Sequence, residues 1–292
     1  MIVSVASGKG GTGKTTVSAS LAWVWERPAV AVDLDVEEPN LHLFLRPDIS
    51  WRKGASMEIP VADPAKCTLC RKCSELCQFK AVSVMGKKLL VFPEMCHGCG
   101  GCLAICPEGA LSSGRRKLGV VEGGRTKNGQ FLSGRLRVGE AMSPPLMREV
   151  KFLLDAMLES SGTDAILDCP PGVSCPAVNA VMDSDVIVLV TEPTPFGFND
   201  FVLAVEAFAP LGKPMGVVIN RAGLGDSTLH RYCADKSIPV LCEIPYNRSI
   251  AEEYAAGNVL AAMNPWLEGL FAELRDNVIR MARAAGAEAA HA

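Results

Sequence analysis

Short apolar runs alternate with helical patterns over most of the chain. Residues 2–6 form a run rich in β-formers, a glycine-rich segment follows, and a helical pattern continues to about residue 26. Residues 29–33 resemble a second buried strand. Further strand-like runs occupy residues 165–167, 186–191, 215–219 and 238–242. Because short apolar strands are typical of a parallel sheet covered on both faces, the pattern predicts an α/β fold with a doubly wound, mostly parallel sheet.

Two further helices are predicted in the second half of the chain. Ser143 is expected to be the N-cap, with Pro144 and Pro145 at the first helical positions of a helix that runs to about residue 159. Residues 265–284 place seven apolar side chains at helical spacing: Trp266, Leu267, Leu270, Phe271, Leu274, Val278 and Met281. A helix packed on the sheet is favoured over a membrane-targeting helix, because acidic residues such as Glu268 and Glu273 would repel anionic lipid.

Between residues 61 and 113 the alternation stops, and eight of the 12 cysteines fall in this stretch. A glycine-rich, basic segment follows to about residue 138 and is expected to be a hairpin or a loop. The change in composition predicts a small α+β module inserted into a larger domain. The expected division is residues 1–60 for the first part of the larger domain, 61–113 for the module and 114–292 for the second part.

Composition limits the classes of function. The chain has 292 residues, 49% of them hydrophobic, and a formal net charge of -3, so nucleic-acid binding through bulk electrostatics is not expected. No signal-like start and no run of roughly 18 apolar residues is present, which predicts a cytoplasmic protein without stable membrane insertion. Because the cytosol keeps thiols reduced, the cysteines predict metal ligation rather than disulfides.

The segment after the first strand has the pattern GxxxxGK[ST] of a phosphate-binding loop. Its glycines let backbone N–H groups converge on phosphate oxygens at a helix N-terminus. Lys14 is expected to reach the β- and γ-phosphates, and the Thr15 hydroxyl to lie on Mg²⁺. An ordinary glycine-rich turn is the alternative. The residues predicted to bind nucleotide here are Gly8, Lys9, Gly10, Gly11, Thr12, Gly13, Lys14, Thr15 and Thr16.

Carboxylates follow two of the predicted strands. Asp168 ends the strand at residues 165–167 and is expected to hold Mg²⁺ through water, in a magnesium site with Thr15 and Asp33. Asp33 and Asp35 end the second strand, near the position of a γ-phosphate in a doubly wound sheet, where one of them orients the attacking water. The alternatives are a capping role for Asp168 and a turn with a helix cap for the pair.

Residues 8–16 resemble the deviant Walker A motif of the MinD, ParA, Mrp and nitrogenase iron-protein superfamily. The resemblance implies that Lys9 reaches the nucleotide of a partner across a dimer, with the same chain or a related ATPase. Residues 33–35 are similar to the Walker A′ motif, which implies that Asp35 positions the hydrolytic water. Lys9, Lys14 and Asp35 are therefore the expected catalytic residues of an ATP hydrolase.

The resemblance extends to the later strands. Residues 168–172 are similar to the Walker B and switch II segments of that superfamily. Asn220 and Arg221 resemble its adenine-contacting motif, and Pro245 lies in a segment that fits a loop beside the base. A strand-ending turn is the alternative for Asn220. Outside the cysteine-rich module and the basic segment, the resemblance covers nearly the whole chain.

The cysteine-rich module contains the pattern CxxCxxCxxxC twice, 29 positions apart. Such a loop brings three thiolates to three irons of a cubane and leaves the fourth iron for a distant cysteine, which in two-cluster ferredoxins comes from the other motif. The spacing therefore predicts two [4Fe-4S] clusters in a ferredoxin-like module. One is assigned Cys67, Cys70, Cys73 and Cys106, and the other Cys96, Cys99, Cys102 and Cys77.

Two zinc sites are the alternative, but zinc sites commonly pair separated CxxC units without a third nearby cysteine. The repeat also extends beyond the ligands, because Ala81 and Val82 recur as Ala110 and Leu111. Pro107 after the last cysteine agrees with the ferredoxin pattern, whereas the residue after Cys77 is a glutamine.

The remaining cysteines and the basic segment suggest additional sites. Cys175 follows the predicted switch loop at a position similar to that of a cluster ligand in the nitrogenase iron protein. The resemblance suggests a shared metal centre, with Cys169 as a second ligand, and a buried or helix-start thiol is the alternative. Cys233 and Cys242 are expected to be core thiols. The basic segment, with only Glu122 as an acidic residue, is either a solvated hairpin or a docking surface for an acidic redox or metal-binding partner. Its cations are Arg115, Arg116, Lys117, Arg125, Lys127, Arg135 and Arg137.

These observations favour an ATP-binding, ATP-hydrolysing iron-sulfur protein. In this hypothesis nucleotide-dependent dimer or switch changes are coupled to electron transfer, or to metallocluster assembly, on a partner protein. A MinD- or ParA-like positioning ATPase with an accessory redox-sensing module is the alternative. A synthetase of the cobyrinate type shares the ATPase fold, but it would leave eight cysteines without a role.

Overall fold

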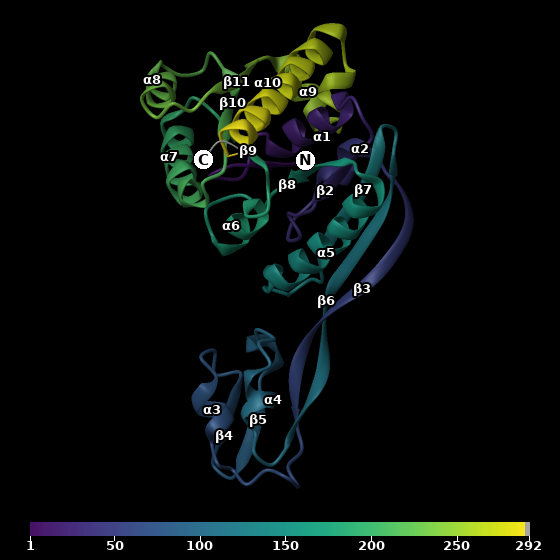
Figure 1. Ribbon diagram of the computed structural model, residues 1–292, viewed down its shortest axis with the longest axis vertical. Coiled ribbons are helices and arrows are strands. Elements are labelled where there is room, and N and C mark those ends of the chain that lie inside the picture. The colour runs from purple at the N-terminus through teal and green to yellow at the C-terminus, as the bar shows by residue number, and fades with distance from the viewer. Residues whose placement is uncertain (290–292) are drawn as a thin grey trace.

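The computed structural model describes the backbone of residues 1–289 and the side chains of residues 1–286. It contains a nine-stranded sheet in the order β11-β10-β9-β1-β8-β2-β7-β6-β3 (Figure 1). The strands are β1 (Ile2–Ala6), β2 (Ala29–Asp33), β3 (Asp48–Ala62), β6 (Leu111–Thr126), β7 (Gly129–Leu136), β8 (Asp164–Asp168), β9 (Val186–Thr191), β10 (Met215–Ala222) and β11 (Val240–Pro245). The six pairings from β11 to β7 are parallel, and β6 pairs antiparallel with both β7 and β3. The predicted α/β fold with a mostly parallel sheet is therefore confirmed.

Helices cover both faces of this sheet. Alternate residues of a strand point to opposite faces, so Val30 and Val32 of β2 belong to one apolar core and Ala29 and Ala31 to the other. The helices are α1 (Lys14–Val24), α2 (Leu41–Leu45), α5 (Ser143–Ser161), α6 (Cys175–Val181), α7 (Pro195–Phe208), α8 (Thr228–Asp235), α9 (Arg248–Ala255) and α10 (Pro265–Ala289), with 3₁₀ turns η2 (Ala209–Leu211) and η3 (Leu260–Ala262). Residues of α1 and α10 lie in one core, and residues of α5, α6 and α7 lie in the other.

The last helix confirms one prediction and the α5 helix corrects another. Leu267, Phe271 and Leu274 are buried in the core beside α1, so α10 packs on the sheet as expected. Helix α5, in contrast, begins at Ser143 itself, and Met142 is the N-cap residue without a side-chain hydrogen bond. The predicted N-cap at Ser143 is therefore wrong by one position. The N–H groups of the first turn have no partner within the helix, so the prolines lose no hydrogen bond at the second and third helical positions. Within the described residues, no helix has the length and apolar content to cross a membrane.

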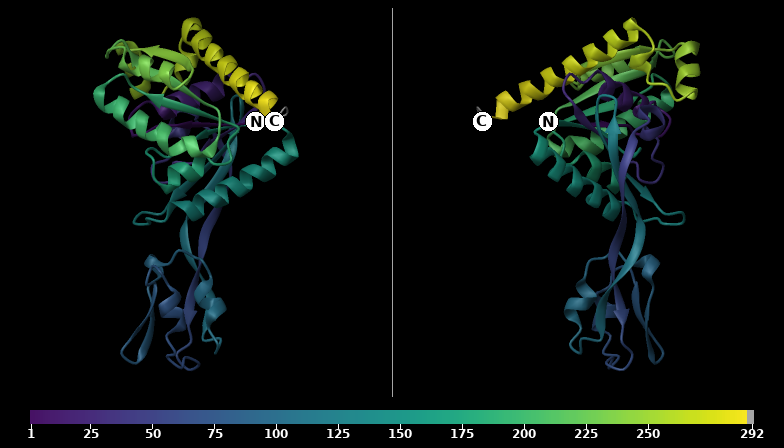
Figure 2. Two further views of the ribbon diagram at one scale, coloured as in Figure 1. Left: turned by 60° about the vertical axis from the view of Figure 1, so that its left-hand side comes forward. Right: turned by 90° about the vertical axis from the view of Figure 1, so that its right-hand side faces the viewer.

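The two longest strands form a ribbon that leaves the sheet. Strands β3 and β6 are 15 and 16 residues long and pair along their lengths, from Asp48 opposite Arg125 to Ala62 opposite Leu111. The body of the protein and a smaller lobe lie at opposite ends of this ribbon (Figures 1 and 2). The hairpin expected after the cysteines is confirmed as β6 and β7, but the sequence pattern did not reveal β3.

The lobe is built from a two-stranded sheet and two short helices. It contains α3 (Lys72–Leu76), β4 (Val82–Met85), β5 (Lys88–Val91), the 3₁₀ turn η1 (Pro93–Met95) and α4 (Gly101–Ile105). Strands β4 and β5 pair antiparallel with each other and with no strand of the large sheet. Its small apolar core includes Cys73, Val82 and Leu111.

A stability prediction follows from the packing of β7. Phe131 is fully buried in the core between α1 and the sheet, so Phe131→Ala should lower the free energy of unfolding by about 3–5 kcal/mol. Phe152 on α5 is 72% exposed, and Phe152→Ala should change the same quantity by less than about 0.5 kcal/mol. Urea unfolding of both variants measures this, and equal losses would contradict the assigned core.

Candidate functional site

The loop between β1 and α1 requires glycine at particular positions. Gly13, the N-cap of α1, has φ 93°, a region that other residues rarely adopt. A Cβ at Gly13 would lie 2.3 Å from the Asn220 amide nitrogen, and one at Gly8 would lie 1.9 Å from the carbonyl oxygen of Asp200. The loop therefore lies directly against helix α7 and strand β10.

The carboxylate of Asp168 is the centre of hydrogen bonding at this edge of the sheet. Lys14 Nζ lies 2.8 Å from Asp168 Oδ1, and Thr15 Oγ1 donates to Asp168 Oδ2 at 2.7 Å. Ser18 Oγ donates to Asp168 Oδ1 at 2.9 Å. Burial would lower the pKa of Lys14, but the charge of Asp168 and its hydrogen bond outweigh burial and raise it. The site thus holds a buried charge pair at the point where a phosphate chain and a cation are expected.

Two more carboxylates lie beside this pair. Asp33 stands next to Asp168 in the parallel register of β2 and β8, and it is fully buried. Its oxygens accept hydrogen bonds from the backbone N–H of Asp35 at 3.1 Å and of Leu41 at 2.9 Å. Burial, followed by the charge of Asp168, raises the pKa of Asp33 well above its ordinary value. Burial also raises the pKa of Asp35 to about 6, despite the nearby charge of Lys14.

Glu192 joins the phosphate loop to the residues expected at the base. Lys9 Nζ lies 2.6 Å from Glu192 Oε1, and Arg221 Nη1 lies 2.6 Å from Glu192 Oε2. Asn220 Nδ2 donates to the carbonyl oxygen of Thr12 at 2.8 Å. The sequence analysis missed Glu192, although its position directly after β9 at the carboxyl edge of the sheet was a usable signal.

A cavity of about 230 Å³ opens beside the glycine loop. Its lining includes Gly11, Gly13, Thr16, Asn220, Arg221, Pro245, Tyr246, Ile250 and Tyr254. The residues predicted to lie beside adenine, Asn220, Arg221 and Pro245, therefore line the same cavity as residues of the phosphate loop. The contribution of α9 through Ile250 and Tyr254 was missed, because a short helix with no motif gives no sequence signal.

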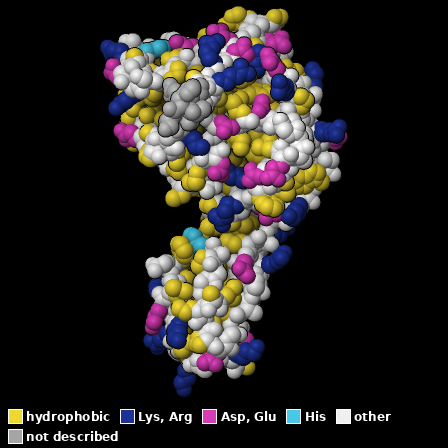
Figure 3. Space-filling view, viewed as in Figure 1, with side chains coloured by type: hydrophobic (Ala, Val, Ile, Leu, Met, Phe, Trp, Pro, Cys, Tyr) yellow, Lys and Arg dark blue, Asp and Glu magenta, His cyan; other side chains and the backbone are white. Residues whose placement is uncertain are grey.

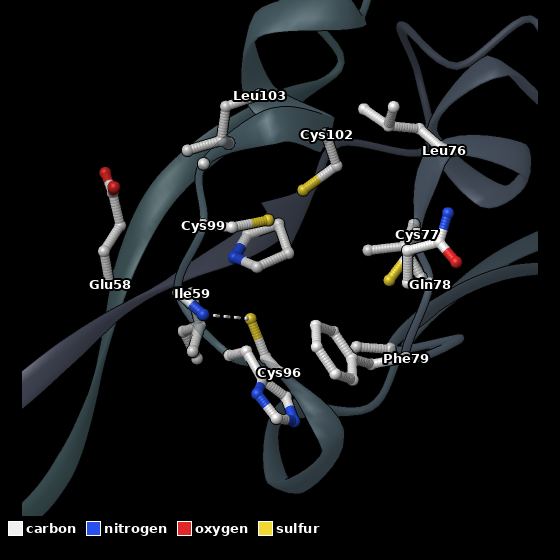
Figure 4. A pocket seen from close by; sticks show the side chains of 16 residues that line it. Glu58, Ile59, Leu76, Cys77, Gln78, Phe79, Cys96, Cys99, Cys102 and Leu103 are labelled. Atoms are coloured by element: carbon white, nitrogen blue, oxygen red, sulfur yellow. Dashed lines mark hydrogen bonds between the residues drawn. The ribbon is translucent and has the colours of Figure 1, made fainter. Parts of the chain in front are cut away.

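The eight cysteines of the lobe form two groups of four around two separate cavities. One cavity is lined by Cys67, Cys70, Cys73 and Cys106, and the other by Cys77, Cys96, Cys99 and Cys102. Figure 4 shows the four sulfur atoms of the second group around a common space. In each group the fourth cysteine comes from the other sequence motif, as the spacing predicted. Within the described residues, no group of three or more His, Cys, Asp or Glu side chains converges closely enough for a single metal ion.

The 29-residue repeat is also present in the backbone. Residues with positive φ occur in pairs 29 positions apart: Leu69 and Gly98, Arg71 and Gly100, and Lys80 and Gly109. Backbone N–H groups approach two sulfur atoms, from Gly98 to Cys96 Sγ at 3.4 Å and from Ala110 to Cys106 Sγ at 3.3 Å. The two cysteine loops therefore share one conformation, and glycine is used at all three positions only in the second.

Comparison with known families now adds to this geometry. Residues 3–260 match the family model described as CobQ/CobB/MinD/ParA nucleotide binding domain. The chain belongs to this family. It is similar to two uncharacterized proteins of Methanocaldococcus jannaschii, at 29% identity over 90% of this chain and 93% of the relative, and at 30% over 84% and 86%.

Solved structures share the fold. The cell division ATPase MinD of Pyrococcus furiosus is 22% identical with a TM-score of 0.58, and 96% of this chain and 98% of that chain are covered. The septum site-determining protein MinD of Pyrococcus horikoshii, complexed with Mg-ADP, is 20% identical with a TM-score of 0.58 over 97% and 98% of the two chains.

The four remaining cysteines lie in different environments. Cys233 and Cys242 are buried, and burial raises their pKa values to about 11 and about 12, as expected for core thiols. Cys169 is also fully buried, with a pKa raised by burial to about 12. Cys175, the first residue of α6, is exposed. A metal centre at Cys175 stays a prediction, while the burial of Cys169 favours the simple thiol there.

Three of the seven cations of the basic segment, Arg116, Arg135 and Arg137, form ion pairs within the chain. Arg116 and Arg137 contact Glu94 at 2.6 and 3.0 Å, and Glu122 lies 2.6 Å from Arg52 and 3.1 Å from Arg135. Glu94 comes from the lobe, which the sequence pattern had not placed near these arginines. For the other four cations, Arg115, Lys117, Arg125 and Lys127, docking of an acidic partner stays a prediction.

The raised pKa of Asp35 predicts how stability depends on pH. The folded, nucleotide-free protein keeps a proton on Asp35 up to about pH 6, whereas the ordinary value is 3.8. The stabilising effect of that proton is complete below pH 3.8, the ordinary pKa of an aspartate, and is lost as pH rises through about 6. Asp35→Asn should therefore raise the free energy of unfolding by roughly 1–3 kcal/mol at about pH 7 and very little at about pH 4. Urea unfolding at both pH values, with the exposed Asp155→Asn as control, measures this; a gain equal at both would contradict it.

Proposed function

We propose that this protein is a Mg²⁺-dependent ATPase whose lobe holds two [4Fe-4S] clusters. The observation that carries the proposal is the joint presence of the Lys14–Asp168–Thr15 site and two groups of four cysteines with exchanged fourth ligands. The family membership supports nucleotide binding, and hydrolysis is inferred from the residues. In this proposal the chain divides at residues 60/61 and 113/114, which lie within the paired strands of the ribbon.

The nucleotide site suits a phosphate chain with Mg²⁺. Thr15 and Asp168 supply the hydroxyl and carboxylate oxygens that Mg²⁺ prefers, and the carboxyl group of Asp33 stands beside Asp168 in the sheet. Lys14 would turn from Asp168 to the phosphates once the cation neutralises that carboxylate. Asp35 then orients and deprotonates the attacking water, for which a pKa of about 6 is well matched near neutral pH.

Dimerisation is part of the same proposal. Lys9 is paired with Glu192 of its own chain, so it would have to leave this carboxylate to reach a partner's nucleotide. The partner is either a second copy or a related ATPase. Glu192 would keep Arg221 as its partner after Lys9 leaves, so this carboxylate, whose side chain is 9% exposed, would not be left unpaired.

The cysteine groups suit cubane clusters better than single ions. A [4Fe-4S] cluster takes one thiolate per iron, so its four ligands surround a volume instead of converging on one atom. The cavities lined by four cysteines each have this arrangement (Figure 4). When bound, such clusters supply one-electron chemistry. The residues around them contribute backbone N–H donors to sulfur and an apolar shell that includes Ile59 and Leu103.

Two biological roles fit such a protein. Electron transfer to a partner, or metallocluster assembly on it, is supported by the lobe alone. Spatial positioning, with the lobe as a redox sensor, is favoured by the comparisons, since the structures with the same fold are named cell division ATPase MinD, ParA family ATPase and McdA. Of the two roles, the comparisons support positioning better. An interaction that changes with the redox state of the lobe but delivers no electrons would favour the sensor.

Hydrolysis tests the nucleotide site. Asp35→Asn should retain Mg·ATP binding and lower the rate of hydrolysis by about 100-fold or more, because it removes the base. In the unmodified protein, kcat/KM should rise with pH through an apparent pKa of about 6, which reports the free protein. Phosphate release and nucleotide titration measure both quantities. Full activity of Asp35→Asn, or a rate that falls as pH rises through this range, would sink the assignment.

Iron and sulfide analysis tests the lobe. Anaerobically prepared protein should contain about eight irons, and Cys106→Ser should lose the cluster held by Cys67, Cys70 and Cys73 while keeping the other. Cys233→Ser, which alters a buried thiol of the body, should keep both. Electron paramagnetic resonance of the reduced variants distinguishes the two clusters. Zinc in place of iron would refute the proposal.

A further inference from the structure

Besides the ribbon, on which Ala81 and Cys96 of the lobe pack in one apolar cluster with Ala55 and Met57, the lobe has a polar attachment to the body. A two-stranded antiparallel ribbon is only marginally stable by itself, and β3 and β6 continue beyond the edge of the sheet without a third strand. Figure 2 shows the lobe at the end of this ribbon in two further views. Figure 3 shows Lys and Arg side chains where the lobe joins the body.

Glu94 supplies the attachment. It lies in η1 of the lobe, and its Oε2 is 2.6 Å from Arg116 Nη1 on β6 and 3.0 Å from Arg137 Nη2 beyond β7. Within the part of the chain that the structure describes, Glu94–Arg137 is the only hydrogen bond or ion pair between residues 63–110 and any residue outside β3 and β6.

The arginines are held from the body side as well. Glu140 Oε2 lies 3.2 Å from Arg137 Nη2, and Glu140 Oε1 lies 3.3 Å from Arg116 Nη2. The side chains of Arg116 and Glu140 are only 6% and 2% exposed. Buried charges of this kind require their partners, because leaving one unpaired is strongly unfavourable. The Glu94 side chain is 67% exposed, so it joins the buried Arg116–Glu140 pair from the solvent side.

A short bonded route leads from this network to the nucleotide site. The backbone N–H of Leu34 donates to the carbonyl oxygen of Asp168 at 2.9 Å, and Leu136 N–H donates to the carbonyl oxygen of Val36 at 2.9 Å. The segment that contains Asp35 is thus tied on one side to Asp168 and on the other to the residue before Arg137. On the lobe side, Glu94 precedes the cluster cysteine Cys96 by two residues.

We propose that Glu94 is a positioning residue that transmits the nucleotide state to the lobe. This inference rests on the proposed ATP site. Displacement of residues 34–36 when Mg²⁺ and nucleotide replace the Lys14–Asp168 pair moves Leu136 and Arg137, and Glu94 carries that movement to the turn before Cys96. The regulated element is the cysteine loop nearest the body, since Gly98 of that loop lies against Met57 of the ribbon.

Hydrogen exchange of the full-length protein tests this coupling without relying on iron. Peptides covering residues 93–106 are followed with and without Mg²⁺ and a non-hydrolysable ATP analogue. The analogue should change their exchange rate about fivefold or more in the unmodified protein, and Glu94→Gln should abolish the change. Lys53→Met is the matched control, because it removes a 2.8 Å ion pair from the ribbon to Glu149 on α5 without touching the lobe. It should keep the response.

The outcomes separate the two proposals. A titration of the analogue accompanies each exchange experiment, and Glu94→Gln should bind it as the unmodified protein does. If the analogue binds but the exchange at residues 93–106 is unchanged, or if Glu94→Gln responds fully, the coupling is overturned and the ATPase stands. If the analogue does not bind the unmodified protein, the ATPase proposal fails, and the coupling fails with it.

Discussion

Asp168 carries a carboxylate that is almost completely buried, at the point where three parallel strands end. A charge in that position must be compensated, and Lys14, Thr15 and Ser18 all bond to it. Its backbone carbonyl also holds Leu34, the residue before Asp35. The phosphate loop, the strand that bears Asp33 and the predicted catalytic loop are therefore arranged around one residue. In the proposed function, a cation and a phosphate chain replace this internal compensation.

The lobe follows a different constraint. It is too small to have a large apolar core. Where such a core would lie, its two cysteine loops enclose cavities. Each loop contributes three cysteines to its own group and one to the other, so neither half can complete its group alone. The matching positive-φ residues indicate that the same loop conformation was used twice. Metal ligation would then replace the hydrophobic stabilisation that a module of this size lacks.

The ribbon determines how these two units relate. Strands β3 and β6, of 15 and 16 residues, exceed the usual length. Their outer halves pair with each other but with no third strand of the sheet. A four-residue network of two arginines and two glutamates stands where the lobe begins. Its two arginines are among the seven cations of the basic segment, and their pairing with Glu94 bears on the orientation of the lobe instead of on a partner.

The sequence by itself determined the local chemistry. Apolar runs indicated the parallel strands, the GxxxxGK[ST] pattern the loop around Lys14, and the cysteine spacing three thiols of each group, because these depend on periodicity or short-range steric needs. The fourth thiol of each group was assigned from the pattern of two-cluster ferredoxins. Long-range contacts were decided only by the tertiary structure. Residues far apart in the sequence meet at three places. Glu192 lies beside Lys9, α9 lines the cavity beside the glycine loop, and Glu94 lies between Arg116 and Arg137. Strand β3 was also missed, because it has no apolar run that would mark it in the sequence. It is held as a strand by its pairing with β6, which exists only in the folded chain.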